Sequence, residues 1–350
     1  MKEMTSRERY FAFVQGKLPD RVPIDPMLES IFPMAQIGRS ADTFYRDSDL
    51  CTEGLIATWK RFGFDVIQAG CNLPQYLELV GGQWTCSENG YPITVSSEPM
   101  FKSIDDIDRA QVRDVRTSPA FKVIIETISK LAEHVGKEVI ICCRCPGTFN
   151  LVRYLIGTDL MFRSLVMDHA FIGRAADLAC DLLIQAGKAY AEAGADVVWY
   201  PDACSSTAFI SPEHYEELAM SRHARFFAEM KKAGLITIYH PDGNEYGILC
   251  QVRSIPNIDV YHMSQEVDLG IVRTIYGRKA LLYGNISGHG CLLLKTPAEI
   301  EEETRLIIEK AGRHGKFAMS PAINMPGNTP PENLKAMLDA AKKYGKYPLV

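Results

Sequence analysis

The stretch LACDLLIQAGKAYAEAGADVVWY, residues 178–200, contains the unit from which the fold can be predicted. A β-branched run, Asp196 to Tyr200, follows directly after a helical pattern. An amphipathic helix that leads into a short buried run is typical of the repeating unit of a parallel sheet covered by helices. The apolar positions at helical spacing are Leu178, Leu182, Ile184, Ala189 and Ala193.

The same alternation recurs along the whole chain and predicts eight parallel strands. Several of these runs are continuously apolar, as strands covered on both faces should be. Eight strands with interleaved helices predict one (β/α)8 TIM barrel over residues 1–350, and an open doubly wound sheet is the alternative. No Gly-x-Gly-x-x-Gly follows an early strand, which disfavours a dinucleotide site. The runs are Arg21–Asp25, Asp65–Ala69, Glu138–Cys143, Asp196–Tyr200, Ile236–His240, Asp259–His262, Ala280–Gly284 and Lys316–Ser320.

Capping signals mark several helix starts, and one region breaks the alternation. Thr5 with Glu8, Thr296 with Glu299 and Thr329 with Glu332 each fit a capping box, and Ser211 fits a partial one. Residues 71–118 contain turn signals between short strand-like pieces, among them Asn89-Gly90-Tyr91-Pro92. We therefore predict a hairpin inserted over the mouth of the barrel in this region.

Composition and charge exclude several classes of function. The chain has 350 residues, 47% of them hydrophobic, and a net charge of −5. It shows no basic stripe, which argues against nucleic-acid binding, and no apolar run long enough to cross a membrane. Its N-terminus lacks the apolar core of a signal peptide, and its ten cysteines lack a disulfide-framework spacing. We expect a cytoplasmic protein, and a homodimer is an open alternative to a monomer.

The most informative polar pair is His240 and Asp242. In a TIM barrel the chemistry lies in the loops that follow the strands, and residues i and i+2 at a strand end point the same way. A histidine and an aspartate placed in this way can share a metal ion or form an oriented acid–base pair. The structural alternative is that His240 caps the strand while Asp242 makes a turn into Gly243.

Other polar residues at strand ends are weaker candidates. Cys145 and Cys204 could be soft metal ligands or redox thiols, although small buried hydrophobic roles are the simpler interpretation. Asp202 is predicted as a catalytic or orienting residue, and the apolar loop from Met27 to Phe32 is expected to line a pocket. The predicted substrate-binding residues are Asp25, Cys145, Cys204, Glu266, Asn285 and Asn324.

Along its whole length the chain resembles the uroporphyrinogen decarboxylase superfamily, whose fold is a (β/α)8 barrel. The resemblance implies one of two branches. True decarboxylases of the family bind eight carboxylates with an arginine-rich loop after the first strand, but residues 24–33 here contain no arginine and two acids. We therefore reject that substrate. The segments that carry the resemblance are Arg7–Arg9, Asp20–Pro23, Gly81-Gly82, Pro146–Phe149, Ala193–Asp196, Ile210–Tyr215, His240–Asn244, Gly284–Ile286 and Thr329–Asn333.

The second branch is similar to the corrinoid-linked methyltransferases, which move methyl groups between small molecules and the cobalt of a corrinoid protein. Members that act on coenzyme M bind zinc through a His-x-Cys pair and a later cysteine. This chain keeps His240, but Asp242 stands at the first cysteine position and Ile323 at the second. A carboxylate in place of thiolate makes a harder Lewis acid, which suits an oxygen better than a thiol.

The resemblance therefore predicts a metal-dependent methyltransferase of the O-demethylase type. It implies a zinc ion on His240 and Asp242, with a third ligand from Glu266, Cys204 or Cys145. The methyl group would come from a small donor, such as a methoxylated aromatic, and go to a cobalamin-type corrinoid on a partner protein. Two alternatives remain: a cofactor-free decarboxylase that uses Asp25 or Asp202, and a non-catalytic protein that only binds the corrinoid partner.

Overall fold

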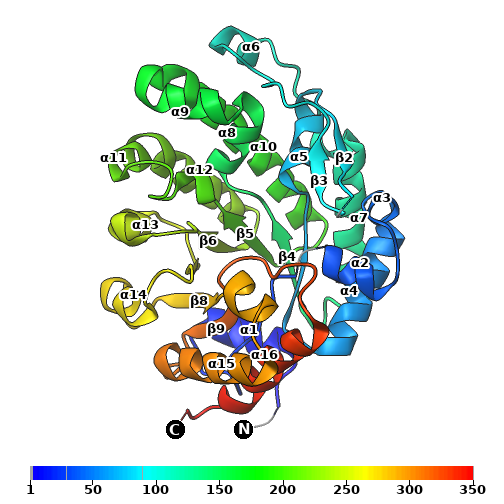
Figure 1. Cartoon of the computed structure of the whole chain (residues 1–350), viewed down its shortest axis with the longest axis vertical. Helices are drawn as coiled ribbons and strands as arrows, with labels where there is room; N and C mark the ends of the chain where they lie inside the picture. The colour runs from blue at the N-terminus through cyan, green and yellow to red at the C-terminus, as the bar shows by residue number, and fades with distance from the viewer. Residues whose placement is uncertain (1–2, 29, 89, 350) are drawn as a thin grey trace.

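A curled parallel sheet of seven strands forms the centre of the protein, and helices surround it (Figure 1). The computed structural model describes residues 3–28, 30–88 and 90–349. The strands follow one another in chain order, each parallel to the next, and seven of the eight predicted runs are confirmed to within two residues at either end. They are β1 (Val66–Ala69), β4 (Ile140–Arg144), β5 (Val197–Pro201), β6 (Ile236–His240), β7 (Val260–His262), β8 (Leu281–Ile286) and β9 (Phe317–Pro321).

Helices alternate with these strands and pack on the outside of the sheet. Most are amphipathic, so one face of each is buried against the strands. The long α helices are α1 (Ser6–Val14), α4 (Ser48–Phe62), α7 (Pro119–His134), α8 (Thr148–Ile156), α9 (Thr158–Met167), α10 (His169–Glu192), α12 (Met220–Lys232), α14 (Leu269–Tyr276), α15 (Pro297–Ala311) and α16 (Pro331–Tyr344). The short ones are α2 (Ile31–Gln36), α3 (Ala41–Phe44), α5 (Leu73–Tyr76), α6 (Ile104–Asp108), α11 (Pro212–His214), α13 (Leu249–Ser254), η1 (Leu77–Val80), η2 (Val115–Thr117), η3 (Ala203–Ser205), η4 (Tyr215–Ala219), η5 (Tyr246–Ile248) and η6 (Gly288–Leu293).

The first predicted strand, Arg21–Asp25, is not confirmed as a strand. Its backbone reaches each of the two edges of the sheet through only one or two hydrogen bonds. At the β9 edge, the Asp25 N–H donates to the Met319 carbonyl at 3.0 Å, and the Met319 N–H donates to the Pro23 carbonyl at 2.8 Å. At the β1 edge, the Asp65 N–H donates to the Ile24 carbonyl at 2.9 Å. The segment thus joins the two edge strands without forming an eighth strand of regular length.

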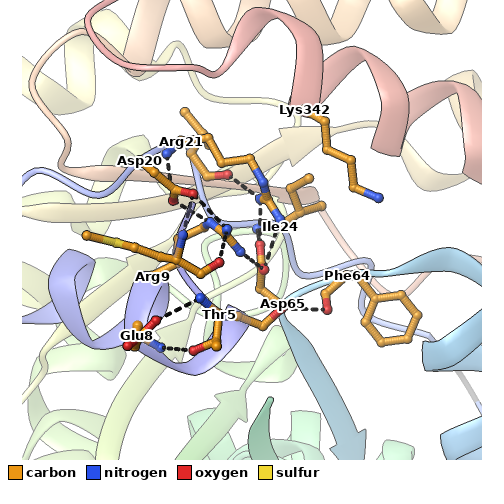
Figure 2. Close-up of polar contacts among 12 residues, drawn as sticks. Thr5, Glu8, Arg9, Asp20, Arg21, Ile24, Phe64, Asp65 and Lys342 are labelled. Carbon is orange, nitrogen blue, oxygen red and sulfur yellow. Dashed lines mark hydrogen bonds and ion pairs between the residues drawn. The ribbon is translucent and has the colours of Figure 1, made fainter. Parts of the chain in front are cut away.

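A buried ionic network holds this segment in place (Figure 2). The Asp65 carboxylate accepts from Arg9 at 2.7 Å, from Arg21 at 2.7 Å and from the Ile24 N–H at 2.8 Å. Arg9 also pairs with Asp20 at 2.6 Å. Each buried charge therefore has an opposite charge beside it, which offsets the cost of removing it from water. The network ties α1 and residues 20–24 to the start of β1.

Two short antiparallel strands lie in the region predicted to hold an inserted hairpin. They are β2 (Trp84–Cys86) and β3 (Pro92–Thr94), with Trp84 opposite Thr94. Asn89, part of the predicted turn between them, lies outside the described residues. In Figure 1 the pair lies near α5 and α3, away from the seven-stranded sheet.

Two of the three predicted capping boxes are confirmed. Thr5 with Glu8 and Thr296 with Glu299 exchange both bonds of the motif, and Ser211 accepts from the His214 N–H. The third prediction is wrong, because α16 begins after Pro330 and the buried Thr329 hydroxyl has no hydrogen-bond partner in the described part of the chain. Two consecutive prolines fix the backbone there, so the helix starts without a side-chain cap. Among the described residues, no helix is long and apolar enough to cross a membrane.

Two apolar cores lie on opposite faces of the sheet. The outer core fills the space between strands and helices, while the inner core contains Cys142, Trp199, Ile238 and Val260. Side chains alternate across a strand, so each residue two positions further along points to the same face. The inner face therefore continues from these residues to Arg144, Pro201, His240 and His262 at the ends of the strands.

Candidate active site

His240, the last residue of β6, is the centre of the candidate site. It is fully buried, and its Nδ1 lies 3.0 Å from the His262 carbonyl oxygen. A carbonyl oxygen only accepts, so Nδ1 must carry a proton. Nε2 has no hydrogen-bond partner among the described residues, and its closest charged neighbour is the Asp242 carboxylate, whose Oδ1 is 3.6 Å away. The reactive nitrogen of the imidazole is thus oriented and left free.

Asp242 owes its position to an unusual backbone conformation. Its φ is +64°, in the left-handed region, and its Oδ1 accepts from the Gly243 N–H at 2.7 Å. The predicted turn into Gly243 is therefore present together with the pairing to His240. Since the side chain of Asp242 is 23% exposed while that of His240 is fully buried, the carboxylate lies between the imidazole and solvent.

His240 and Asp242 each favour the charged form of the other. Burial alone would lower the pKa of His240, but the neighbouring Asp242 carboxylate outweighs it and raises that pKa above its usual value. Burial acts to raise the pKa of Asp242, yet His240 brings it down to about 2. The pair is therefore shifted toward its imidazolium–carboxylate form, in which His240 can deliver a proton from Nε2.

His262 lies against His240 but stays neutral. The two rings stack with centroids 4.2 Å apart. Its Nδ1 accepts from the Trp199 indole N–H at 3.1 Å, and its Nε2 donates to the Pro321 carbonyl at 2.8 Å. Burial and the neighbouring charge of His240 lower the pKa of His262 well below its usual value. His262 therefore positions His240, through its carbonyl, without competing for the proton.

Glu245 is a second buried acid close to this pair, and it was not predicted from the sequence. One of its oxygens accepts from the Ser264 N–H at 2.8 Å, while the other has no partner among the described residues. Burial raises its pKa to about 8. The carboxyl of Glu245 is thus largely protonated near neutral pH and becomes mostly ionised only in alkaline solution.

A Glu245→Gln variant should reveal this burial as a change in the pH dependence of stability. The folded-state pKa lies above the unfolded value, so the stability that Glu245 contributes in acid is lost as pH rises toward 8. The unfolding free energy of the variant relative to the wild type should rise by a few kcal/mol between pH 5 and 9, at about 1.4 kcal/mol per pKa unit. Urea denaturation at several pH values measures it. Glu53→Gln, an exposed change on α4, should show no such rise, and equal pH dependence of both variants would contradict the assignment.

Asp202 is buried behind the site, and both of its carboxylate oxygens already accept hydrogen bonds. Its carboxylate accepts from the Phe149 N–H at 3.0 Å and the Asn150 N–H at 2.8 Å, and it pairs with His223 at 2.9 Å. These bonds satisfy the N-terminus of α8. A direct role in catalysis stays a prediction, and it would require breaking these bonds.

The other predicted residues do not gather around His240 and Asp242. The Cys145 thiol faces the Leu183 carbonyl of α10, 3.9 Å away, in the helix layer. Burial raises the pKa of Cys204 to about 12, so its thiol is protonated and a poor ligand. Glu266 lines a separate cavity of about 600 Å³ with Asn285, whose amide donates to the Ser264 and Val267 carbonyls.

Two further predicted residues lie elsewhere near the strand ends. The Asp25 carboxylate accepts from the Met27 N–H at 2.9 Å and from Gln68 at 3.1 Å, and burial raises its pKa to about 7. The side-chain oxygen of Asn324 is buried, and none of the described residues hydrogen-bonds to it. From the predicted apolar loop, Met27 reaches the inner core, whereas Phe32 packs in the outer one.

The predicted zinc site is not assembled from these residues. A zinc ion in a catalytic site normally takes three protein ligands. His240 and Asp242 supply two suitable atoms, but the described residues contain no group of three histidines, cysteines or acids that could hold a metal. The residues present therefore do not fit a resident zinc ion of that type, and the pair is better described as an acid–base dyad.

The chain belongs to the uroporphyrinogen decarboxylase (URO-D) family, whose pattern matches residues 5–344. It is 24% identical to the methylcobamide:CoM methyltransferase MtaA of Methanosarcina barkeri, over 98% of this chain and 99% of the relative. It is 23% identical to the methylcobamide:CoM methyltransferase MtbA of Methanosarcina acetivorans, with the same coverage. A solved structure of a methyltransferase from Methanosarcina mazei shares the fold, with a TM-score of 0.87 at 22% identity, covering 98% of this chain and 99% of that one.

Proposed function

We propose that this protein transfers a methyl group from the oxygen of a small donor to the cobalt of a corrinoid carried by a partner protein. The matched relatives MtaA and MtbA, aligned over 98% of this chain, are named as methylcobamide:CoM methyltransferases, which supports methyl transfer with a corrinoid. The single observation that carries the oxygen donor is the ion pair of His240 and Asp242, in which the Nε2 of His240 has no hydrogen-bond partner among the described residues.

The dyad matches the chemical requirement of an ether donor. Breaking a carbon–oxygen bond leaves an alkoxide or phenoxide, which is strongly basic and benefits from a proton in the transition state. A thioether releases a thiolate, which is far less basic and needs an acid less. The buried imidazolium is thus more useful for an oxygen leaving group than for sulfur.

The atoms and electrons of this step balance with His240 as the proton donor and Co(I) of the partner as the nucleophile. Co(I) of the partner corrinoid supplies an electron pair to the methyl carbon, and the new cobalt–carbon bond forms as the methyl–oxygen bond breaks. His240 gives its Nε2 proton to the departing oxygen, and the products are methyl-Co(III) and an alcohol or phenol. Asp242 stabilises the imidazolium before transfer, and the His262 carbonyl keeps the ring oriented through Nδ1.

The metal requirement distinguishes this account from the zinc-dependent one. Because only two ligands meet at His240, we expect methyl transfer from an ether donor to survive dialysis against a chelator with less than a twofold loss of rate. Visible spectroscopy of methyl-cobalt, with metal content measured on the same samples, checks this. Loss of activity on chelation, restored by stoichiometric zinc, would contradict the acid mechanism and support the predicted zinc centre.

A further inference from the structure

Arg144, the last residue of β4, points into the centre of the curled sheet. Ile140 and Cys142, four and two residues earlier on the strand, belong to the inner core, so Arg144 faces the same side. Gly70 packs directly against it, because a side chain at that position would come within 2.6 Å of the Arg144 Cβ. The backbone that carries the guanidinium is therefore closely held.

The guanidinium is buried without an ion-pair partner in the described part of the chain. Arg144 is only 9% exposed, its Nε has no hydrogen-bond partner among the described residues, and its side chain makes a long contact of 3.4 Å to the Asn72 side chain. No carboxylate among the described residues lies within ion-pair distance of it. By contrast Arg9, equally buried, pairs with both Asp20 and Asp65. Since an unpaired buried charge is costly, Arg144 is poised for an anion that none of the described residues supplies.

The indole ring of Trp199 lies next to both Arg144 and the reactive His240. Arg144 and Trp199 are register partners on β4 and β5, and the guanidinium carbon lies 5.8 Å from the Trp199 ring centroid. The His240 ring stacks against the same Trp199 indole, with ring centroids 5.9 Å apart. A flat molecule lying along Trp199 would therefore reach the guanidinium at one end and the proton donor at the other.

A single carboxylate is the anion that suits this position. An arginine presents two parallel N–H groups that match a carboxylate, and one positive charge balances one negative charge. The nearby acid, Asp25, is already bonded to the Met27 N–H and to Gln68, and it disfavours a ligand with several negative charges. The surrounding inner core is apolar and aromatic, which suits an organic ring.

We infer that Arg144 binds the carboxylate of the substrate, which makes the methyl donor a methoxylated aromatic carboxylate. The inference rests on the proposed function and adds the substrate class to it. The carboxylate lies on Arg144, the aromatic ring lies along Trp199, and the methoxy oxygen lies beside the Nε2 of His240.

Binding measured without any corrinoid tests the inference directly. Titration calorimetry compares 3-methoxybenzoate with its uncharged isostere 3-methoxybenzamide. The unaltered protein should bind the carboxylate at least about tenfold more tightly. Arg144→Gln should remove this preference, and Arg144→Lys should keep part of it. Arg253→Gln, which removes another arginine that lies over an aromatic ring, should leave the preference unchanged.

Two comparisons keep the inference separate from folding and from the proposed function. The two ligands are compared on the unaltered protein, so an unstable Arg144→Gln variant does not block the test. Equal affinity for both ligands, no binding of either, or a preference retained in a folded Arg144→Gln variant would overturn the inference. If the protein prefers the carboxylate ligand but transfers no methyl group, only the proposed function is refuted. If uncharged methyl ethers methylate the cobalt as fast as 3-methoxybenzoate does, only the inference is refuted.

Discussion

Replacing His240 with alanine is expected to lower the rate of methyl transfer from an ether donor by about a thousandfold. General acid catalysis by a positioned side chain contributes about 10²- to 10⁴-fold. Here the acid is buried, oriented through Nδ1 and held charged by Asp242, conditions that favour the upper part of that range. Single-turnover formation of methyl-cobalt with saturating donor measures the chemical step.

Control variants separate this effect from a change in folding or binding. His289→Ala removes an exposed histidine on η6 and should leave the rate unchanged. Asp242→Asn keeps the size of the side chain but removes its charge, so it should lower the pKa of His240 and shift the alkaline limb of the pH–rate profile toward acid. A His240→Ala protein that retains more than a tenth of the rate would show that His240 is not the proton donor.

Replacing Asp65 with asparagine is expected to destabilise the fold by about 3–5 kcal/mol, the typical cost of removing one partner from a buried ionic network. The change would leave Arg9 and Arg21 with a neutral partner in a buried position. It would also weaken the acceptor of the Ile24 N–H, which helps join residues 20–24 to the β1 edge. Equilibrium denaturation in urea measures the loss.

The control is an ion pair on the surface. Asp105→Asn breaks the exposed pair with Arg109, and a solvated pair of this kind contributes little to stability. The urea concentration at the midpoint of unfolding should be close to the wild-type value for Asp105→Asn. If both variants unfolded at the same denaturant concentration, the network at Asp65 would not be what holds the two edges of the sheet together.

The strands were predictable because the physical signal is local. A buried parallel strand needs a short apolar run, and the run at Ile236–His240 gives both its bounds from sequence alone. The first predicted run fails because strand formation also needs neighbours in register. Val22 and Ile24 are apolar and buried, yet the segment reaches each edge of the sheet through only one or two bonds.

The site was predictable only in part, because the decisive contacts join residues far apart in the chain. The His240–Asp242 pair follows from two-residue spacing at a strand end. The neutral state of His262 depends on Trp199, and nothing in the sequence places those rings together. Glu245 also lies on a loop, where burial is set by the fold. Arg144 was detectable in principle, since it continues the inward alternation of Ile140 and Cys142.

The most direct test of the account is the visible spectrum of a reaction between the full-length protein, a Co(I) corrinoid protein and 3-methoxybenzoate. We predict conversion of the Co(I) spectrum to that of methyl-cobalt, with release of 3-hydroxybenzoate in equal amount, and no conversion by the His240→Ala variant. Methyl-cobalt formed only from a thioether or an amine, with ether donors inactive, would contradict the role assigned to the His240–Asp242 dyad.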